Sequence, residues 1–199
     1  MCSFQDAPFN RQHTGKLQMT SLNHLTNQGT EFTIRQPNED DAERIISHSK
    51  VMFSSTDQLL TTLEEYTITV DNERSWIKGL NKNPRALLLV AECDSNLVGF
   101  LFFIPNSKIK NAHTGEFGVN VHPSCQRQRI GRALIQTLLV WARENTLIVK
   151  VYLQVFATNS NAINLYNSLG FIEEGRHIKV IRQPNGEYVD VIQMYCWVK

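Results

Sequence analysis

The sequence predicts an α/β (α+β) domain in which a mixed β-sheet is covered by helices. Three observations predict this class. Short apolar runs typical of strands recur along the chain, segments with helical periodicity lie between them, and turn signals indicate two hairpins. At 199 residues the chain is long enough for one domain with a sizeable core.

The N-terminal segment looks different from the rest of the chain. Residues 1–30 are polar, rich in Gln, Asn and Thr, and without clear periodicity. We therefore expect a loosely attached extension, followed by a domain at 31–199. Order should begin with a strand at 32–36, "FTIRQ", whose apolar positions alternate. A helix should follow, with Asn38 as its N-cap and acidic residues in its first turn.

The next part of the chain predicts a second helix and a hairpin. Residues 51–66 fit neither helix nor strand clearly. Residues 71–81 have helical periodicity, and Asp71 is the expected N-cap. Two apolar runs around "CDSN" predict an antiparallel hairpin at 85–104, and alternating residues predict another strand at 114–121.

The second half of the chain predicts helices and strands in alternation. An amphipathic pattern predicts a helix at 130–145, and a β-branched run predicts a strand at 148–157. A short helix is expected at 159–170. Strands at 176–183 and 187–198 flank "PNG", which is a hairpin turn signal.

Composition excludes several classes of function. The 42% of hydrophobic and 20% of charged residues are typical of a globular protein. A net charge of +1 gives no reason to expect nucleic acid or an acidic membrane as a partner. The apolar runs are too short to span a bilayer, and the N-terminus lacks an apolar signal core. We therefore expect a cytoplasmic protein.

The cysteines suggest neither a zinc site nor a disulfide framework. Cys2, Cys93, Cys125 and Cys196 are far apart and show no C-x-x-C spacing. We expect free thiols in a reducing cytoplasm, and no metal.

The stretch "QRQRIGRALI", residues 126–135, runs from a loop straight into a helix. Unpaired amides at a helix N-terminus attract anions, and Gly131 would allow close approach of a ligand. Arg127, Arg129 and Arg132 add positive charge, and Gln126 adds amide donors. Two interpretations stay open for this stretch alone: a cradle for a diphosphate, or a basic surface turn.

A second stretch, "LQVFATNSNAINLYNSLGF", joins a strand to a short helix. Alone, its Asn159 and Asn161 are typical turn or cap residues, and Tyr166 is typical of a packed aromatic. Together with "VNVHP", "QRQRIG" and "RAL" before it, however, this stretch resembles the signatures of the GNAT superfamily of acetyl-CoA-dependent N-acetyltransferases. The resemblance covers about residues 32–197, and "NSNAINLYNSLGF" has every fixed position of the second signature.

The resemblance implies a fold and a cofactor site. The sheet would be mostly antiparallel and twisted, with splayed strands at 114–121 and 148–156. The pantetheine arm of acetyl-CoA would pair with the first of these strands like an added strand, and its diphosphate would rest on loop amides. The residues expected to bind it are Val119, Val121, Gln126, Arg127, Gln128, Arg129, Ile130, Gly131, Arg132, Asn159 and Asn161.

The resemblance also implies direct acyl transfer to an amine, with no nucleophilic cysteine. The backbone amide of Val119 would hold the oxyanion, and Tyr166 would face the thioester sulfur as proton donor. Glu116 is the candidate base, although an exposed strand carboxylate explains it equally well. Weaker candidates are His122, for which we favour a role in the loop or in contact with the cofactor, His113 and Glu65.

Arg129 departs from the signature, because it stands at the first glycine of the loop motif. If that position requires a positive φ, arginine costs about 1 kcal/mol or more. If it requires only closeness to phosphate, the side chain can turn to solvent and add attraction. We keep cofactor binding as the expectation and expect it to be weaker.

The leading hypothesis is an N-acetyltransferase that acts on a small amine, an amino acid or a protein N-terminus. The alternative is a catalytically weak module that binds acyl-CoA for sensing or scaffolding. The acceptor side should come from residues 51–75, including Phe53, Asp57, Glu64 and Glu65, and from the last hairpin, although a solvated acidic face explains the acidic residues as well. A homodimer through terminal strands is possible for this family, with Tyr195 and Trp197 as contacts or as core residues.

Overall fold

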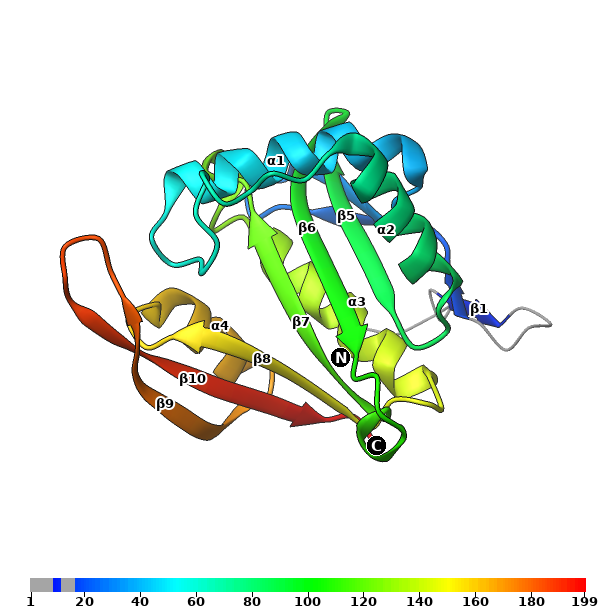
Figure 1. Cartoon of the computed structure of the whole chain (residues 1–199). Coiled ribbons are helices and arrows are strands. Elements are labelled where there is room, and N and C mark those ends of the chain that lie inside the picture. Colours follow the sequence, from blue (N-terminus) through cyan, green and yellow to red (C-terminus); the bar gives the residue numbers. More distant parts are fainter. Residues whose placement is uncertain (1–8, 12–16) are drawn as a thin grey trace.

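A computed structural model describes residues 9–11 and 17–199 of the chain (Figure 1). The strands are β1 (Phe9–Arg11), β2 (Leu17–Met19), β3 (Leu22–Leu25), β4 (Glu31–Arg35), β5 (Leu87–Cys93), β6 (Asn96–Pro105), β7 (Thr114–Val121), β8 (Lys150–Phe156), β9 (Ile172–Arg182) and β10 (Tyr188–Trp197). The helices are α1 (Ala42–Ser55), α2 (Val70–Lys82), α3 (Ile130–Glu144) and α4 (Ser160–Ser168), with short 3-10 turns η1 (Glu39–Asp41), η2 (Ile109–Asn111) and η3 (Pro123–Cys125).

Eight of the strands form one open sheet in the order β3-β4-β5-β6-β7-β8-β10-β9, and β1 pairs with β2 separately. Neighbours in the large sheet run antiparallel, except β7 and β8, which run parallel. The predicted mixed, mostly antiparallel sheet flanked by helices is confirmed. The parallel pair is possible because α3 forms the crossover between its two strands.

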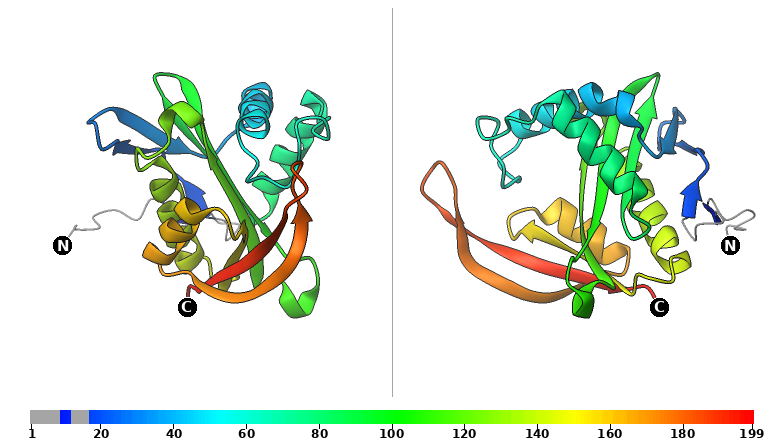
Figure 2. Two further views of the ribbon diagram at one scale, coloured as in Figure 1. Left: turned by 90° about the vertical axis from the view of Figure 1, so that its left-hand side faces the viewer. Right: turned by 45° about the vertical axis from the view of Figure 1, so that its right-hand side comes forward.

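The helices lie in two layers, one on each face of the sheet (Figures 1 and 2). On one face α1 and α2 cover β5 and β6 through buried residues that include Ile45, Ile77 and Phe100. On the other face α3 and α4 close the larger core, where Trp141 of α3 packs edge-on against Phe103 of β6 at 5.4 Å. Full burial of each such side chain stabilises the fold by about 1.5–3 kcal/mol, so both layers hold the sheet firmly.

Regular structure begins earlier than expected. We predicted order from residue 32, but β3 pairs antiparallel with β4. Only alternate residues of this edge strand are partly covered, so the sequence lacks an apolar run that would reveal it. The hydroxyl of Thr26, which accepts from the amides of Gln28 and Thr30, fixes the turn after it. The division of the chain near residue 30 into an extension and a domain stays a prediction.

Helix boundaries differ from the predictions in two places. The ambiguous segment after residue 50 begins as the last turn of α1, which runs to Ser55. The N-cap of α2 is Thr69 rather than Asp71, because the Thr69 side chain accepts from the amide of Asn72. Asp71 instead lies in the first turn, where a carboxylate is also favourable. Asn38 is an N-cap as predicted, although the turn that it caps is η1, just before α1.

Cys93, Cys125 and Cys196 are free thiols. Cys2 and most of the stretch inspected for a signal sequence lie in residues 1–8, outside the described residues. Within the described ranges, none of the helices combines the length and the apolar character needed to cross a bilayer.

Candidate active site

The parallel strands β7 and β8 separate along their length and leave an open edge between them. They pair over three positions, from Thr114–Lys150 to Glu116–Tyr152, and no further rungs follow in the described strands. Figure 1 shows the two strands diverging from there like the arms of a V. The splayed central strands expected from the resemblance are therefore present.

Backbone groups of β7 point into this opening. The amide of His122 donates to the carbonyl of Val98 on β6 at 2.8 Å, so this pair is hydrogen-bonded. Antiparallel pairs alternate between hydrogen-bonded and non-hydrogen-bonded, and Val121 and Val119 fall at the non-bonded positions. Their N–H and C=O groups therefore point away from β6, toward β8. Val119 lies just beyond the part of β7 that pairs with β8, so its backbone groups face the opening.

The opposite wall of the opening has the same construction. The amide of Ala157 donates to the carbonyl of Asp190 on β10 at 2.9 Å, so the alternation along β8 can be counted from this pair. Gln154 and Phe156 fall at the non-bonded positions, and their backbone groups point toward β7. An extended ligand chain between β7 and β8 would find backbone donors and acceptors on both sides.

Glu116 lies on the face of β7 that is turned toward α1. Asn120 shares this face, and its side-chain oxygen lies 2.6 Å from Nε2 of His48 on α1. The ring of Phe102 lies over Gly118, where a Cβ atom would come within 2.5 Å of it. Glu116 is half-buried beside these groups, and burial raises the pKa of its carboxyl. A carboxylate with a raised pKa is a better proton acceptor near neutrality.

The helices after the two strands begin at the same end of the opening, because β7 and β8 are parallel. The first amide of α3 with a helical partner is that of Ala133, which donates to the carbonyl of Arg129. The preceding amides, including that of Gly131, are free to bind an anion. Asn159 caps α4 by accepting from the amide of Ala162 at 3.2 Å. Its side-chain NH2 group has no protein partner among the described residues.

The glutamine side chains of the loop donate hydrogen bonds to its backbone and so stabilise its shape. Gln126 donates to the carbonyl of Val121 at 3.3 Å, and Gln128 donates to that of Ser124 at 3.3 Å. Nδ1 of His122 lies 2.7 Å from the Ser124 hydroxyl and 3.3 Å from its amide nitrogen. The role of His122 in the loop or in contact with the cofactor stays a prediction. The loop is therefore held before any ligand arrives.

Two arginines of the loop adopt the left-handed conformation. Arg127 has φ 61° and Arg129 has φ 68°, so the signature glycine position does require a positive φ. The first of the two possibilities for Arg129, a conformational cost from a positive φ, therefore applies. The β3–β4 turn supports this part of the loop, because Asn27 Nδ2 donates to the carbonyl of Arg127 at 3.2 Å.

Replacing Arg129 by glycine is expected to stabilise the fold. A left-handed L-residue costs about 1–2 kcal/mol, and glycine loses about 0.5–1 kcal/mol more backbone entropy on folding. The free energy of unfolding should rise by about 0.5–1 kcal/mol, measured by urea denaturation. Arg129→Ala is the matched control, because it removes the same side chain but keeps the Cβ atom. Equal gains in both variants would show that the backbone is not the cause.

Tyr166 lies inside the core at the base of the opening. It is 8% exposed, and its ring contacts Phe117 of β7 at 6.0 Å and Phe171 at 6.0 Å, both edge-on. Burial raises the pKa of its hydroxyl to about 12. The phenol therefore keeps its proton at neutral pH, as a proton donor must.

The two segments predicted to form the acceptor side meet in the structure. The carbonyl of Asp57, in the α1–α2 loop, accepts from Gln183 at the end of β9 at 3.2 Å. In the same loop Gln58 accepts from the hydroxyl of Thr158, which follows β8, at 3.0 Å. Phe53 packs against Tyr66 with ring centroids 4.8 Å apart. These contacts place the loop beside the end of β8 and the last hairpin.

The remaining candidates lie in other surroundings. His113 is exposed in the turn before β7. Glu65 accepts from the amide and hydroxyl of Thr62, and these hydrogen bonds lower the pKa of its carboxyl. Asn161 is exposed on the first turn of α4. Cys125 lies beside Ser124 at the end of η3.

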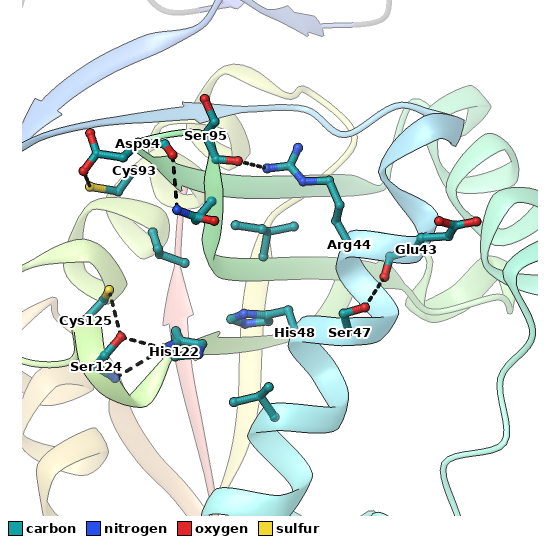
Figure 3. A pocket seen from close by; sticks show the side chains of 14 residues that line it. Glu43, Arg44, Ser47, His48, Cys93, Asp94, Ser95, His122, Ser124 and Cys125 are labelled. Atoms are coloured by element: carbon teal, nitrogen blue, oxygen red, sulfur yellow. Dashed lines mark hydrogen bonds between the residues drawn. The ribbon is translucent and has the colours of Figure 1, made fainter.

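A cavity of ≈ 700 Å³ opens between α1, the β5–β6 turn and residues 122–125 (Figure 3). His48 and His122 face each other across it, with ring centroids 6.2 Å apart. Its described lining includes no residue of β8 or α4, so it is separate from the opening between β7 and β8. The strand opening is the candidate site, because the outward backbone groups of β7 and the loop amides meet there.

Sequence reasoning missed His48. It lies on the buried stripe of α1, three residues after Ile45, and this spacing was the available signal. Burial, with a smaller contribution from His122, lowers its pKa and keeps the ring neutral. Its buried Nδ1 atom has no hydrogen-bond partner among the described residues.

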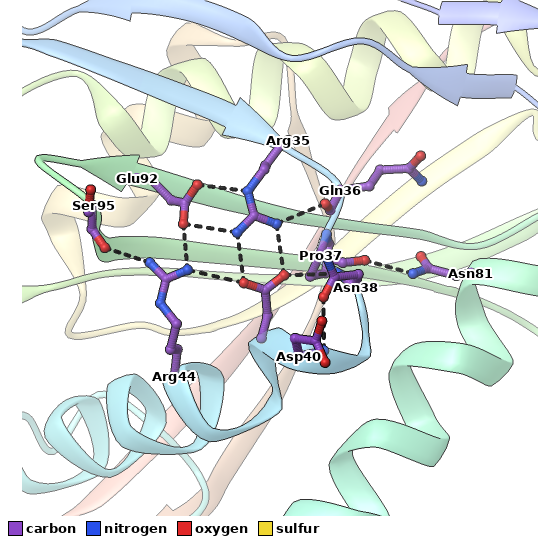
Figure 4. Close-up of polar contacts among 10 residues, drawn as sticks. Arg35, Gln36, Pro37, Asn38, Asp40, Arg44, Asn81, Glu92 and Ser95 are labelled. Carbon is purple, nitrogen blue, oxygen red and sulfur yellow. Dashed lines mark hydrogen bonds and ion pairs between the residues drawn. The ribbon is translucent and has the colours of Figure 1, made fainter.

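One side of the cavity is fixed by a network of four charged side chains (Figure 4). Arg35 of β4 binds Asp41 and Glu92 through paired hydrogen bonds of 2.7–2.9 Å. Arg44 of α1 contacts the same two carboxylates and donates to the carbonyl of Ser95 at 2.8 Å. The network therefore ties α1 to β4 and to the β5–β6 turn.

Replacing Asp41 by asparagine is expected to destabilise the fold by about 3 kcal/mol, because it leaves two arginines short of a buried partner. The Asp41 side chain is only 5% exposed. Chemical denaturation would measure the loss. Glu39→Gln is the matched control, because Glu39 pairs with Lys78 in solvent and should change stability by about 0.5 kcal/mol or less.

The same network makes stability depend on pH. Burial alone would raise the pKa of Asp41, but hydrogen bonds from Arg35 and the Asn38 amide lower it overall. Hydrogen bonding to Arg35 likewise lowers the pKa of Glu92. Both carboxylates therefore stabilise the fold above about pH 4, and this contribution is lost as the pH falls through their lower folded values. When the pH falls below that value, the free energy of unfolding should therefore decrease less in Asp41→Asn than in the wild type.

Comparisons with known proteins fit this geometry. The model of the Acetyltransferase (GNAT) family matches residues 53–171. The chain is 30% identical over 132 residues to a spermidine N(1)-acetyltransferase of Vibrio cholerae, covering 66% of this chain and 75% of that protein. It is 27% identical over 158 residues to an L-amino acid N-acetyltransferase of Escherichia coli, covering 77% and 97%.

A solved structure has the same fold. A putative acetyltransferase from Salmonella typhimurium, crystallised with its cofactor acetyl-CoA, superposes with a TM-score of 0.75 at 24% identity, over 84% of this chain and 94% of that one.

Proposed function

Because this chain belongs to the GNAT acetyltransferase family, we propose that it transfers the acetyl group of acetyl-CoA directly to a primary amine. It is an acetyl-CoA-dependent acyltransferase. The observation that carries the proposal is the open edge of β7, where the backbone groups of Val119 and the amide of Val121 point toward β8 and lead to the amides at the start of α3 that have no helical partner.

We assign the cofactor to this edge. The pantetheine arm would pair with Val119 and Val121 in the manner of an added strand. The diphosphate would accept hydrogen bonds from the amides of residues 127–132, since the amide of Gln126 donates to the carbonyl of Pro123. Asn159 would contribute its free side-chain NH2 group, while its oxygen caps α4.

The chemistry follows from the groups around the opening. Glu116, directly or through water, would take a proton from the acceptor, and the amine nitrogen would attack the thioester carbonyl carbon. The amide of Val119 points into the opening and would hold the oxyanion that forms. When the carbon–sulfur bond breaks, Tyr166 would give its proton to the departing thiolate. The products are an amide and free CoA.

The acceptor is a primary amine, and three kinds fit the proposal: a small amine, an amino acid or a protein N-terminus. Relatives are named for spermidine and for L-amino acids. A thiol-release assay with acetyl-CoA and a panel of polyamines, amino acids and peptides tests the proposal. Release that depends on one acceptor class supports the enzyme. Binding of acetyl-CoA without turnover on any acceptor would favour the sensing or scaffolding module instead.

Three further expectations stay proposals: action in the cytoplasm, a domain at residues 31–199, and a homodimer. Trp197 is 55% exposed, while the ring of Tyr195 is covered by Lys150 at 4.6 Å. Trp197 is therefore the better candidate for a subunit contact. Sedimentation of the wild type and of Trp197→Ser would test it, because loss of a dimer in the variant is the expected result.

A further inference from the structure

We propose that a groove between the β3–β4 hairpin and α3 binds a phosphate monoester through Arg129 and Arg132. This inference rests on the proposed cofactor site, because it concerns the same arginines, but it assigns their side chains to a separate groove. The ligand is either the 3′-phosphate of CoA itself or a phosphate group of another molecule.

The groove has a volume of ≈ 410 Å³ and lies beside the first two turns of α3. Its charged and polar wall consists of Arg129, which is the N-cap of α3, and of Arg132 and Gln136, which lie four residues apart on one side of the helix. His24 and Phe32 form the wall on the hairpin. Figure 2 shows this hairpin beside the start of α3.

The positive charge in the groove is not neutralised. None of its lining residues in the described chain is acidic. Arg132 donates to the hydroxyl of Ser168 at 2.7 Å, which is a neutral acceptor. Arg129 has no hydrogen bond or ion pair of its side chain within residues 9–11 and 17–199. By contrast, Arg35 and Arg44 each bind two carboxylates. Two guanidinium groups that have no carboxylate partner among the described residues, beside one groove, suit a dianionic phosphate.

The hairpin wall is held in place and contributes no charge of its own. The ring of His24 stacks on Phe32 at 5.2 Å with an interplanar angle of 20°. Burial lowers the pKa of His24, so its ring is neutral at physiological pH. The contact between Asn27 and the carbonyl of Arg127 fixes the hairpin against the loop. The groove is therefore present before a ligand binds.

Isothermal titration with acetyl-CoA and with acetyl-3′-dephospho-CoA tests the proposal. The protein panel is the wild type, Arg129→Gln, Gln136→Glu and Arg143→Gln. Gln136→Glu places a negative charge in the groove without altering the loop, since Gln136 is exposed on the second turn of α3. Arg143→Gln is the matched control, because it removes an exposed arginine from the far end of the same helix. A parallel arm measures thermal stabilisation by inorganic phosphate in the absence of CoA.

If the ligand is the 3′-phosphate, the wild type and Arg143→Gln should bind acetyl-CoA about tenfold tighter than the dephospho form. Arg129→Gln and Gln136→Glu should lose most of that preference. If the ligand is another phosphate, the preference is absent, and inorganic phosphate stabilises the wild type but not Gln136→Glu. Binding of both CoA forms with equal affinity, together with no effect of phosphate, would overturn the groove proposal alone. Failure of the wild type to bind either form would instead overturn the proposed function.

Discussion

Replacing Tyr166 by phenylalanine is expected to lower kcat/KM for acetyl transfer about a hundredfold, which is within the range for a lost general acid. The change removes only the hydroxyl, and the ring keeps its contacts with Phe117 and Phe171. The wild-type hydroxyl, with a pKa of about 12, carries its proton throughout the working pH range. Without it, the thiolate must leave unprotonated or take a proton from water.

The control for this variant is Tyr188→Phe, because Tyr188 is 59% exposed on the last hairpin. It should retain wild-type kcat/KM. Both variants should keep the wild-type melting temperature within a few degrees, so that a loss of rate in Tyr166→Phe is not a loss of fold. If folded Tyr166→Phe has an unchanged kcat/KM, Tyr166 is not the proton donor and serves only in packing.

The sequence predicted most of the fold because most elements carry local signals. The run "ALLLVAECDSNLVGFLFFI" predicts a buried hairpin, and the structure has it as β5 and β6. The strand β3 carries no such signal, since it is an edge strand of only four residues and has no apolar run. The cap of α2 was misassigned by two positions because Thr69 and Asp71 are both good cap residues. Only the backbone geometry decides between them.

The candidate site was less predictable wherever it depends on contacts between distant residues. The motif residues could be named from "VNVHP" and "NSNAINLYNSLGF". His48 reaches Asn120 across 72 positions, and Asn27 reaches Arg127 across 100. Contacts between residues so far apart in the chain leave no periodic pattern in the sequence. For Arg129 the sequence left open whether the position needs a positive φ, and the structure shows that Arg129 has one.

The strain at Arg129 and the proposed groove have a joint consequence. A glycine there would make the loop more stable but would remove one of the two guanidinium groups that line the groove. Strained residues often persist where their side chains serve a ligand, at some expense of stability. Arg129→Gly should therefore combine a higher free energy of unfolding with weaker binding in the phosphate groove.

Replacing Glu116 by glutamine is expected to lower kcat/KM about 10²–10⁴-fold, the usual range for a lost general base. Glutamine has nearly the same shape but cannot accept the proton. Glu31→Gln is the matched control, because Glu31 is an exposed strand carboxylate on β4 and should leave the rate unchanged. A folded Glu116→Gln variant with wild-type activity would make Glu116 an ordinary strand carboxylate and move the search to other groups near the opening.

The pH dependence separates a base from a residue that only shapes the site. Burial raises the pKa of Glu116, so the carboxylate forms at a higher pH than an exposed glutamate would require. The wild-type kcat/KM should fall as the pH decreases through this raised value, because only the ionised form accepts a proton. Protonation of the acceptor amine affects wild type and Glu116→Gln alike, so the ratio of their rates cancels it. The ratio of the wild-type rate to the Glu116→Gln rate should decline toward low pH if Glu116 is the base. A ratio that does not depend on pH would assign Glu116 a structural role.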